Sequence, residues 1–179
     1  MGYYVQECKT EFYGQVYATY LLSHYADLKL PYSFSMAFQF LTSPLLVGSA
    51  FLCFNDQDEV VGAFGYIRGT GEKNYEDTHV AQLQIIHLSE AHRGGVLLGV
   101  ALQGLMEQVR EQAEEIRHFH FWVPSKLGLH RLCSKLGEKK ATWETSQGEI
   151  EEYHGNAADW KAYADRLSKN EHRNGGMTE

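Results

Sequence analysis

The chain has 179 residues, of which 44% are hydrophobic, and this length and composition suit one globular domain with a sizeable core. Its formal net charge is −7, and its lysines and arginines are scattered. This excludes the basic stripe with which nucleic-acid-binding proteins neutralise phosphates, so we expect neither DNA nor RNA as a partner. An acidic surface is compatible with a cationic substrate such as an amine, although modest negative charge usually serves solubility.

The cysteines and the N-terminus indicate the cellular compartment. Cys8, Cys53 and Cys133 lie far apart and form no CxxC pair, which is typical of free thiols in a reducing environment. The first residues lack the basic and apolar regions of a signal peptide, and no stretch approaches the ~18 apolar residues of a membrane span. We therefore expect a cytoplasmic protein with no membrane partner.

The first quarter of the chain predicts a strand and two helices. The strand covers residues 3–8, and Thr10 caps the first helix. The second helix begins near Ser33 or Ser35 and ends at Pro44, because proline cannot continue the helical hydrogen-bond ladder. Its inward side is expected to carry Phe34, Phe38 and Leu41.

A β meander follows. Residues 50–54 and 60–67 are apolar and flank Asn55–Asp58, whose turn chemistry is typical of an antiparallel hairpin. A polar loop over residues 69–77 then leads into a strand over residues 79–88.

The most informative stretch runs from Gln82 to Met106, where this strand meets Arg93-Gly94-Gly95 and turns directly into a helix. Apolar residues recur in that helix at helical spacing, at Leu98, Leu102, Leu105 and Val109. A helix N-terminus leaves backbone N–H groups unpaired and carries partial positive charge, and glycine lets a ligand approach the backbone closely. The order of strand, turn and helix therefore predicts a phosphate-binding turn.

The remaining chain alternates strands with short helices. A strand over residues 118–123 stops at Pro124 and is followed by a short helix that ends at Gly137. This helix is expected to turn four side chains inward, those of Leu129, Leu132, Cys133 and Leu136.

The chain then closes with a hairpin and a helix. The hairpin pairs residues 139–145 with residues 149–154, and Asn156 caps the helix. We expect a single domain over residues 1–167 and a flexible polar tail over residues 168–179.

This order of elements resembles that of the GNAT acetyltransferase superfamily from about Tyr3 to Tyr153. The stretch HLSEAHRGGVLLGVALQGLMEQ is similar to the acetyl-coenzyme A signature of that family, an R/Q-x-x-G-x-G/A turn with Arg93 in the first position. A second stretch, PSKLGLHRLCSKLG, is similar to the family's segment after the fifth strand. The resemblance implies an α/β (α+β) fold with a mixed, mostly antiparallel sheet of about six or seven strands flanked by helices, and a splayed strand pair at the acetyl-CoA site.

The resemblance also implies a reaction and the residues that hold the acetyl donor. The reaction is direct transfer of an acetyl group from acetyl-CoA to a primary amine of a small molecule, peptide or protein, within a ternary complex and without a metal. The implied acetyl-CoA contacts are Ile86, His87 and Leu88 by their position in the strand, with Arg93, Gly94, Gly95, Val96, Leu97 and Leu98 in the turn.

Three side chains are candidates for proton transfer, and each has a structural alternative. His87 suits a general base because imidazole titrates near pH ~6.5, but a strand histidine is more often a half-buried structural residue. Glu90 either relays a proton through water or favours the helix dipole. Cys133 either protonates the leaving thiolate or packs as a small core residue. His118 and His120 share a strand face, but without a third ligand we expect no metal.

Departures from the family pattern leave other functions open. The family's glycine positions fall on Val96 and Leu98, and Cys133 stands where many members have a tyrosine. The alternative is a GNAT-like protein that binds CoA or another ligand with weak or no catalysis. A third hypothesis is a homodimer formed through the region of Trp143, Tyr153 and Trp160.

Overall fold

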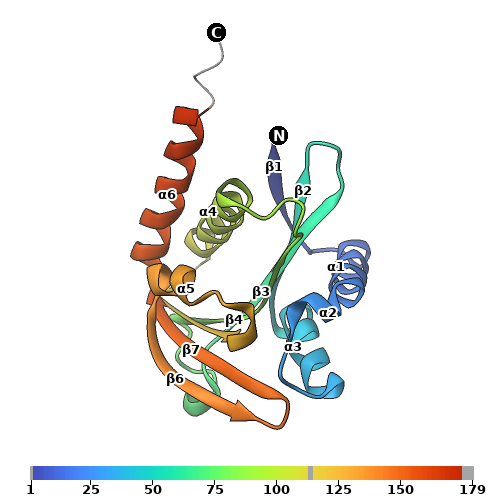
Figure 1. Cartoon of the computed structure of the whole chain (residues 1–179), viewed down its shortest axis with the longest axis vertical. Coiled ribbons are helices and arrows are strands. Elements are labelled where there is room, and N and C mark those ends of the chain that lie inside the picture. The colour runs from blue at the N-terminus through green and yellow to red at the C-terminus, as the bar shows by residue number, and fades with distance from the viewer. Residues whose placement is uncertain (1, 113–114, 175–179) are drawn as a thin grey trace.

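A seven-stranded mixed sheet forms the centre of the computed structural model, which describes residues 2–112 and 115–174 (Figure 1). The strand order is β1-β2-β3-β4-β5-β7-β6. Only β4 and β5 run parallel among these neighbours, so the mostly antiparallel sheet expected from the sequence is confirmed. The strands are β1 (Tyr3–Glu7), β2 (Gly48–Asn55), β3 (Val60–Arg68), β4 (Val80–Leu88), β5 (His118–Pro124), β6 (Glu138–Thr145) and β7 (Gly148–Asn156).

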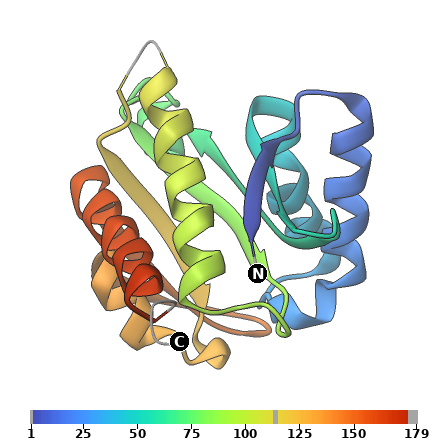
Figure 2. The same cartoon turned by 90° about the horizontal axis from the view of Figure 1, so that it is seen from above.

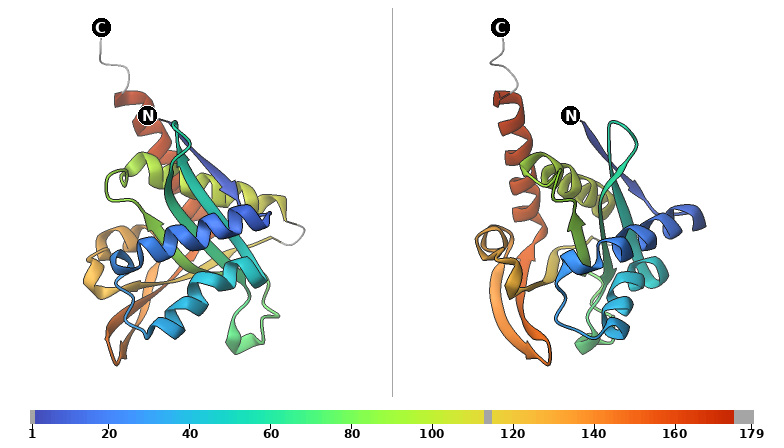
Figure 3. Two further views of the ribbon diagram at one scale, coloured as in Figure 1. Left: turned by 90° about the vertical axis from the view of Figure 1, so that its right-hand side faces the viewer. Right: turned by 45° about the vertical axis from the view of Figure 1, so that its right-hand side comes forward.

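Helices cover both faces of the sheet, with α1, α2 and α3 on one face and α4 and α6 on the other (Figures 2 and 3). Of the described helices, none combines the length and apolar character needed to cross a membrane. The helices are α1 (Glu11–Ser23), α2 (Tyr25–Leu28), α3 (Phe34–Val47), α4 (Gly95–Glu111), α5 (His130–Leu136) and α6 (Ala157–Asn174), with short 3-10 turns η1 (Gly71–Lys73) and η2 (Ser125–Leu127).

The core has one part on each face of the sheet. On the α1 face, helices α1 and α3 bury Tyr17, Leu21 and Leu41 against Leu52 and Ile85. On the α4 face, the buried cluster includes Phe64, Leu97, Leu105, Phe119 and Trp160.

Several local predictions are confirmed by hydrogen bonds. The Oγ1 atom of Thr10 accepts from the Tyr13 amide and caps α1, and Ser33 caps α3 in the same way through Met36. The Oδ1 atom of Asn156 accepts from the Asp159 amide at 2.8 Å at the start of α6.

The prediction for α3 is wrong in two respects. Phe34 and Phe38 are exposed, whereas Leu41 is buried as expected, and Ala37 and Pro44 are buried with it. The helix also continues through Pro44 to Val47. Proline leaves the carbonyl of Phe40 without its usual helical donor, and the Ser43 hydroxyl donates to that carbonyl at 3.4 Å. Proline is tolerated here because a neighbouring side chain supplies a hydrogen bond.

The C-terminal elements correct three further expectations. Leu129 is exposed rather than inward-facing. Tyr153 and Trp160 are buried in the core of their own chain, so of the three aromatic residues proposed for self-association only Trp143 is exposed. Helix α6 runs beyond Leu167, the expected domain boundary, to Asn174. The flexible tail stays a prediction, and residues 175–179 lie outside the described residues.

Gly65 provides a test of the packing between α3 and the sheet. A Cβ atom at Gly65 would lie 2.5 Å from Cβ of Pro44 and 2.9 Å from the Tyr17 hydroxyl. We expect Gly65→Ala to lower the free energy of unfolding by about 1–3 kcal/mol, measured by urea denaturation.

Gly14→Ala is the matched control. Gly14 lies within α1, where an added Cβ meets only Cδ2 of Leu45 at 3.7 Å. Alanine favours helix, so this variant should be as stable as the parent or more stable by up to about 1 kcal/mol. Equal stability of the two alanine variants would contradict the packing described here.

Candidate functional site

The sheet opens between β4 and β5. The two strands pair from Val80–His118 to Leu83–Phe121, and no further pair between them is present in the described strands. Beyond this point β4 stays paired with β3 as far as Leu88, whereas β5 stays paired with β7 as far as Pro124. The opening is the splayed strand pair that the family resemblance implied.

A β-bulge in β4 coincides with the start of this opening. Gly65 pairs with Ile85 and Tyr66 pairs with Leu83, so Gln84 is the extra residue of the bulge. A bulge bends and twists its strand, and here it bends β4 at the position where pairing with β5 stops. The Ser43 hydroxyl of α3 also lies 3.3 Å from Oε1 of Gln84, so its single hydrogen is shared between this oxygen and the Phe40 carbonyl.

The bulge also changes which face the following side chains occupy. Leu83 packs in the α4-face core, but Ile85 packs in the α1-face core, although strict alternation would place both residues on one face. His87 therefore lies on the α1 face beside Tyr20. Leu88 packs against the α4-face core, and Ile86 is exposed.

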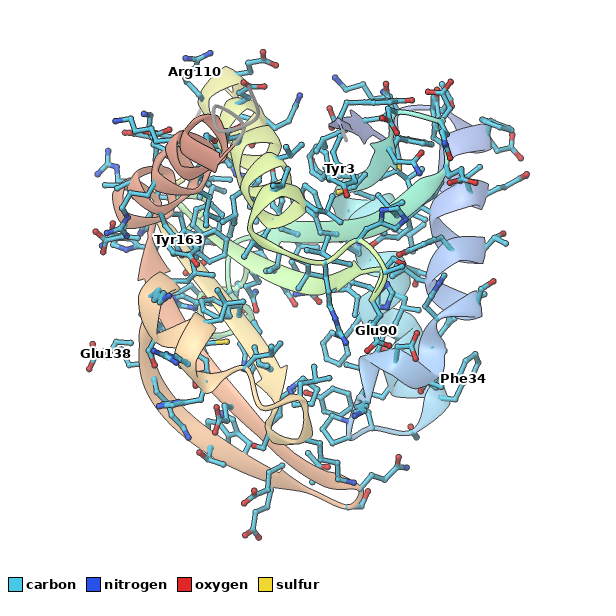
Figure 4. All side chains as sticks on the ribbon, turned by 45° about the horizontal axis from the view of Figure 1, so that its top comes forward. Tyr3, Phe34, Glu90, Arg110, Glu138 and Tyr163 are labelled. Atoms are coloured by element: carbon cyan, nitrogen blue, oxygen red, sulfur yellow. The ribbon has the colours of Figure 1, made fainter. Side chains whose placement is uncertain are left out.

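The turn from β4 into α4 is held by hydrogen bonds at both ends. The amides of His92 and Arg93 donate to the Ser89 carbonyl, at 3.0 and 2.7 Å. The Tyr3 hydroxyl and Nδ1 of His92 are 3.4 Å apart, which ties the turn to β1. Glu90, labelled in Figure 4, lies in this turn between the half of the molecule formed by α1–α3 and the half formed by α5, β6 and β7.

The N-terminus of α4 offers free backbone donors. The first helical bond at this end runs from the Leu98 amide to the Gly94 carbonyl. In the part of the chain that the structure describes, the amides of residues 94–97 have no acceptor, and no side chain caps the helix. Gly94 and Gly95 are exposed. These donors and the helix dipole suit a phosphate group.

The glycines near this turn have different structural roles. A Cβ at Gly94 would meet nothing within 4 Å, so the backbone is open to a ligand there. A Cβ at Gly99 would lie 3.1 Å from Cβ of Leu167, and one at Gly104 would lie 2.9 Å from Cβ of Val5. The last two glycines therefore allow α6 and β1 to pack closely on α4, which explains their spacing without a ligand.

Arg93 and Glu90 form an exposed ion pair. Nη2 of Arg93 lies 3.0 Å from Oε1 of Glu90, and both side chains are well exposed. The guanidinium group is beside the free helix N-terminus and adds positive charge to it. The Glu90 carboxylate partly neutralises that charge. Neither role considered for Glu90 from the sequence, a proton relay or an effect on the helix dipole, included this ion pair.

His87 lies in a cluster that the sequence did not indicate. Its Nδ1 atom is 2.9 Å from the Tyr20 hydroxyl, and its ring centroid is 4.8 Å from that of His24. Its Nε2 atom is 3.7 Å from Oδ2 of Asp27, which is longer than a hydrogen bond. Asp27 is 64% exposed. The side of the imidazole that bears Nε2 therefore faces an exposed carboxylate.

The surroundings of His87 keep its imidazole neutral. Burial has the largest effect and lowers the pKa below its ordinary value, and the nearby His24 lowers it further. Asp27 acts in the opposite direction but does not reverse the shift. A neutral imidazole near physiological pH can accept a proton.

Cys133 has the properties of a core residue. It packs in the α4-face core and is only 4% exposed. Burial, with a smaller contribution from Glu151, raises the pKa of its thiol to about 12. A thiol this weakly acidic is a poor proton donor to a thiolate whose own pKa is near ~8.5.

His118 and His120 are each paired with another histidine ring. His118 makes an edge contact with His79, and His120 stacks on His154 with centroids 3.6 Å apart. Burial lowers the pKa of His120 to about 4, and the neighbouring His154 adds to this shift. Over the described ranges no group of three His, Cys, Asp or Glu side chains has the arrangement of a metal site.

Two cavities lie away from the opening. One of about 760 Å³ lies between α4 and α6 and is lined by Val109, Ile116 and Ala164 among others. The other, of about 310 Å³, lies between β1 and α4 beside Val5 and Gly104. Neither includes a residue of the opening or of the 89–94 turn. We place the candidate site at the opening because the free helix amides and His87 flank it.

Comparison with known proteins gives a match in structure only. No family model matches the sequence, and no curated protein matches it. A GNAT-family acetyltransferase from Staphylococcus aureus Mu50 matches with a TM-score of 0.64 and 15% identity, over 87% of this chain and 99% of that one.

Two further solved structures match in the same way. An aminoglycoside N(6′)-acetyltransferase from Legionella pneumophila matches with a TM-score of 0.59 and 11% identity, over 90% of this chain and 97% of its own. A spermidine N-acetyltransferase from Vibrio cholerae matches with a TM-score of 0.59 and 9% identity, over 88% of this chain and 95% of its own. The chain therefore has the fold of the GNAT acetyltransferases, at low sequence identity to the members it resembles.

Proposed function

We propose that this protein is an acetyl-CoA-dependent N-acetyltransferase that acts on a primary amine in the cytoplasm. The main support is the position of two features at the same end of β4. Its C-terminal part is unpaired on the β5 side, and the chain turns from this end into the free N-terminus of α4. Two of the structurally similar proteins are named for amine acceptors, spermidine and aminoglycosides. The three cysteines are free thiols, which suits a reducing compartment.

The turn and the opened strand would hold acetyl-CoA. The amides of residues 94–97 would bind its diphosphate, with Arg93 adding charge and Leu98 following in the first turn of α4. The open space at Gly94 fits such a group. The edge of β4 at Ile86–Leu88, unpaired on the β5 side, would orient the arm that carries the acetyl thioester. When bound, acetyl-CoA supplies the acetyl group as a thioester.

His87 would accept the proton that the attacking amine must lose. The Tyr20 hydroxyl, accepting from Nδ1–H, would hold the tautomer in which Nε2 carries the lone pair. Nε2 and the Asp27 carboxylate, 3.7 Å apart, would both face the amine. Asp27 would then stabilise the imidazolium that forms. Glu90, paired with Arg93, would reduce the positive charge at the turn. The buried Cys133 has no role in the proposed reaction.

A second candidate is a GNAT-like protein that binds CoA or another ligand without efficient catalysis. The burial of Cys133, which stands where the resemblance implied a proton donor, favours it. Calorimetric titration with acetyl-CoA, followed by a thiol-release assay with a set of primary amines, separates the two. Binding with thiol release supports the acetyltransferase, and binding without release supports the second candidate. No binding of acetyl-CoA would exclude the acetyltransferase and would leave only the form of the second candidate that binds another ligand.

Reversing the charge of Arg93 tests the proposed diphosphate site. We expect Arg93→Glu to weaken acetyl-CoA binding by at least about tenfold, equivalent to ~1.4 kcal/mol, because it places a carboxylate beside the free α4 amides. Arg117→Glu is the control, since Arg117 is at least as exposed but precedes the closed end of the β4–β5 pair. The measurement is calorimetric affinity. If both variants bind like the parent, the diphosphate lies elsewhere.

Substitution of His87 tests the proposed base. His87→Ala should lower kcat by about 100-fold or more, the usual contribution of a general base, and Tyr20→Phe by about fivefold, the cost of one hydrogen bond of ~1 kcal/mol. His130→Ala, an exposed histidine on α5, should behave like the parent.

The pH dependence provides a second readout of the same group. Because protonation removes the base, kcat of the parent should fall as pH drops through the pKa of His87, which lies below 6.5. His87→Ala should lack this acidic limb. An unchanged pH profile in that variant would show that another group accepts the proton.

A further inference from the structure

The α1 face of the sheet carries an acidic and aromatic surface beyond β4. Helices α1 and α3 pack over β2, β3 and β4 on this face. On β5 and β7 the same face presents His120, Trp122, Glu152 and His154, since Phe121 and Tyr153 alternate onto the α4 face. Trp122 directly follows Phe121, the last β5 residue paired with β4. This surface therefore adjoins the opening.

Glu152 is the charged group at the centre of this surface. Its cross-strand neighbours are Trp122 on β5 and Ala141 on β6. Its Oε2 atom accepts from Nε1 of Trp143 at 2.8 Å, and its Oε1 atom lies 2.7 Å from Nε2 of His154. The side chain is 16% exposed, whereas Trp143 is 54% exposed. A partly sheltered carboxylate thus lies among aromatic side chains.

The carboxylate stays ionised and keeps capacity for another donor. Burial acts to raise the pKa of Glu152, but the hydrogen bonds from His154 and Trp143 outweigh it and hold the pKa below its ordinary value. A carboxylate has about four lone-pair sites, and two are used here. The lysines of β6 bind other acids: Lys139 pairs with Glu151 and Lys140 with Glu138.

We propose that Glu152, with the rings of Trp122 and Trp143, binds a second positive charge on the acceptor, so that the preferred acceptor is a diamine or polyamine. The inference rests on the proposed acetyltransferase function and names the acceptor class for that site. A carboxylate beside indole rings suits an alkylammonium group, which gains from both charge and the aromatic faces.

The strand order sets the spacing between the two nitrogens. Glu152 lies on β7, two strands from β4. Neighbouring paired strands are ~4.8 Å apart, and β4 and β5 diverge beyond Leu83, so the Glu152 carboxylate and the free edge of β4 are separated by more than about 10 Å. The acceptor would carry its reacting amine at one end of a flexible chain and its second charge at the other.

Matched ligands and variants test this inference. The ligands are 1,8-diaminooctane and octylamine, which share a chain length and differ in the terminal charge. The first readout is tryptophan fluorescence during titration without acetyl-CoA, which reports on Trp122 and Trp143. The second is KM in the thiol-release assay. We expect the parent to bind the diamine about tenfold more tightly than the monoamine.

Three variants assign the preference to Glu152. Glu152→Gln removes the charge but keeps the length of the side chain and one acceptor oxygen for the Trp143 indole, and it should abolish the preference for the diamine with little effect on octylamine. Glu152→Asp should retain the preference. Glu149→Gln, an exposed acid on the same strand, should match the parent. Equal binding of the two ligands by the parent, or equal effects of the Glu149 and Glu152 variants, would overturn the inference.

The two readouts separate this inference from the function on which it rests. Diamine binding that depends on Glu152, together with an absence of thiol release, would support the proposed role of Glu152 and refute the acetyltransferase. Thiol release with no preference for the diamine would refute only the proposed role of Glu152.

Discussion

The bulge at Gln84 is the constraint on which the candidate site depends. One extra residue in β4 ends the parallel pairing with β5 and turns the rest of the strand over, so that His87 joins Tyr20 and Asp27 while Leu88 joins the opposite core. The same irregularity thus coincides with the end of β4–β5 pairing and places His87, the proposed base, on the α1 face. α3 supports the bulge through the contact between Ser43 and Gln84, which links the packing of this helix to the geometry of the site.

Helix α4 combines a structural role with a free end. Along its length, Gly99 and Gly104 let α6 and β1 approach closely, and apolar residues fix the helix to the sheet. At its first turn the amides of residues 94–97 have no acceptor among the described residues, and Gly94 borders open space. Unpaired helical amides are tolerated in solvent, but a rigidly held helix end of this kind also provides an ordered set of donors without any rearrangement.

The sequence predicted the elements whose signals are local and missed the features that arise from tertiary structure. Thr10, Asn156 and the period of α4 act within a few residues, and the elements they indicated are present. In contrast, the alternation of Gln82, Leu83, Gln84 and Ile85 predicts a regular strand and conceals the bulge. The contact of Tyr20 with His87 joins residues 67 apart, so no local pattern contains it. For α3, Phe34 and Phe38 are more apolar than Ala37 and Pro44, which are buried in their place, so hydrophobicity alone does not identify the buried side, where Pro44 packs closely on Gly65.

In the proposed complex, acetyl-CoA would bind between the opened end of β4 and the first turn of α4. The most direct test is a titration of ¹⁵N-labelled protein with acetyl-CoA, followed by amide chemical shifts in NMR spectra. We expect the largest shifts at the amides of residues 94–97 and 86–88, because those groups would contact the ligand. Shifts confined to the cavity between α4 and α6, or no shifts at saturating ligand, would contradict it.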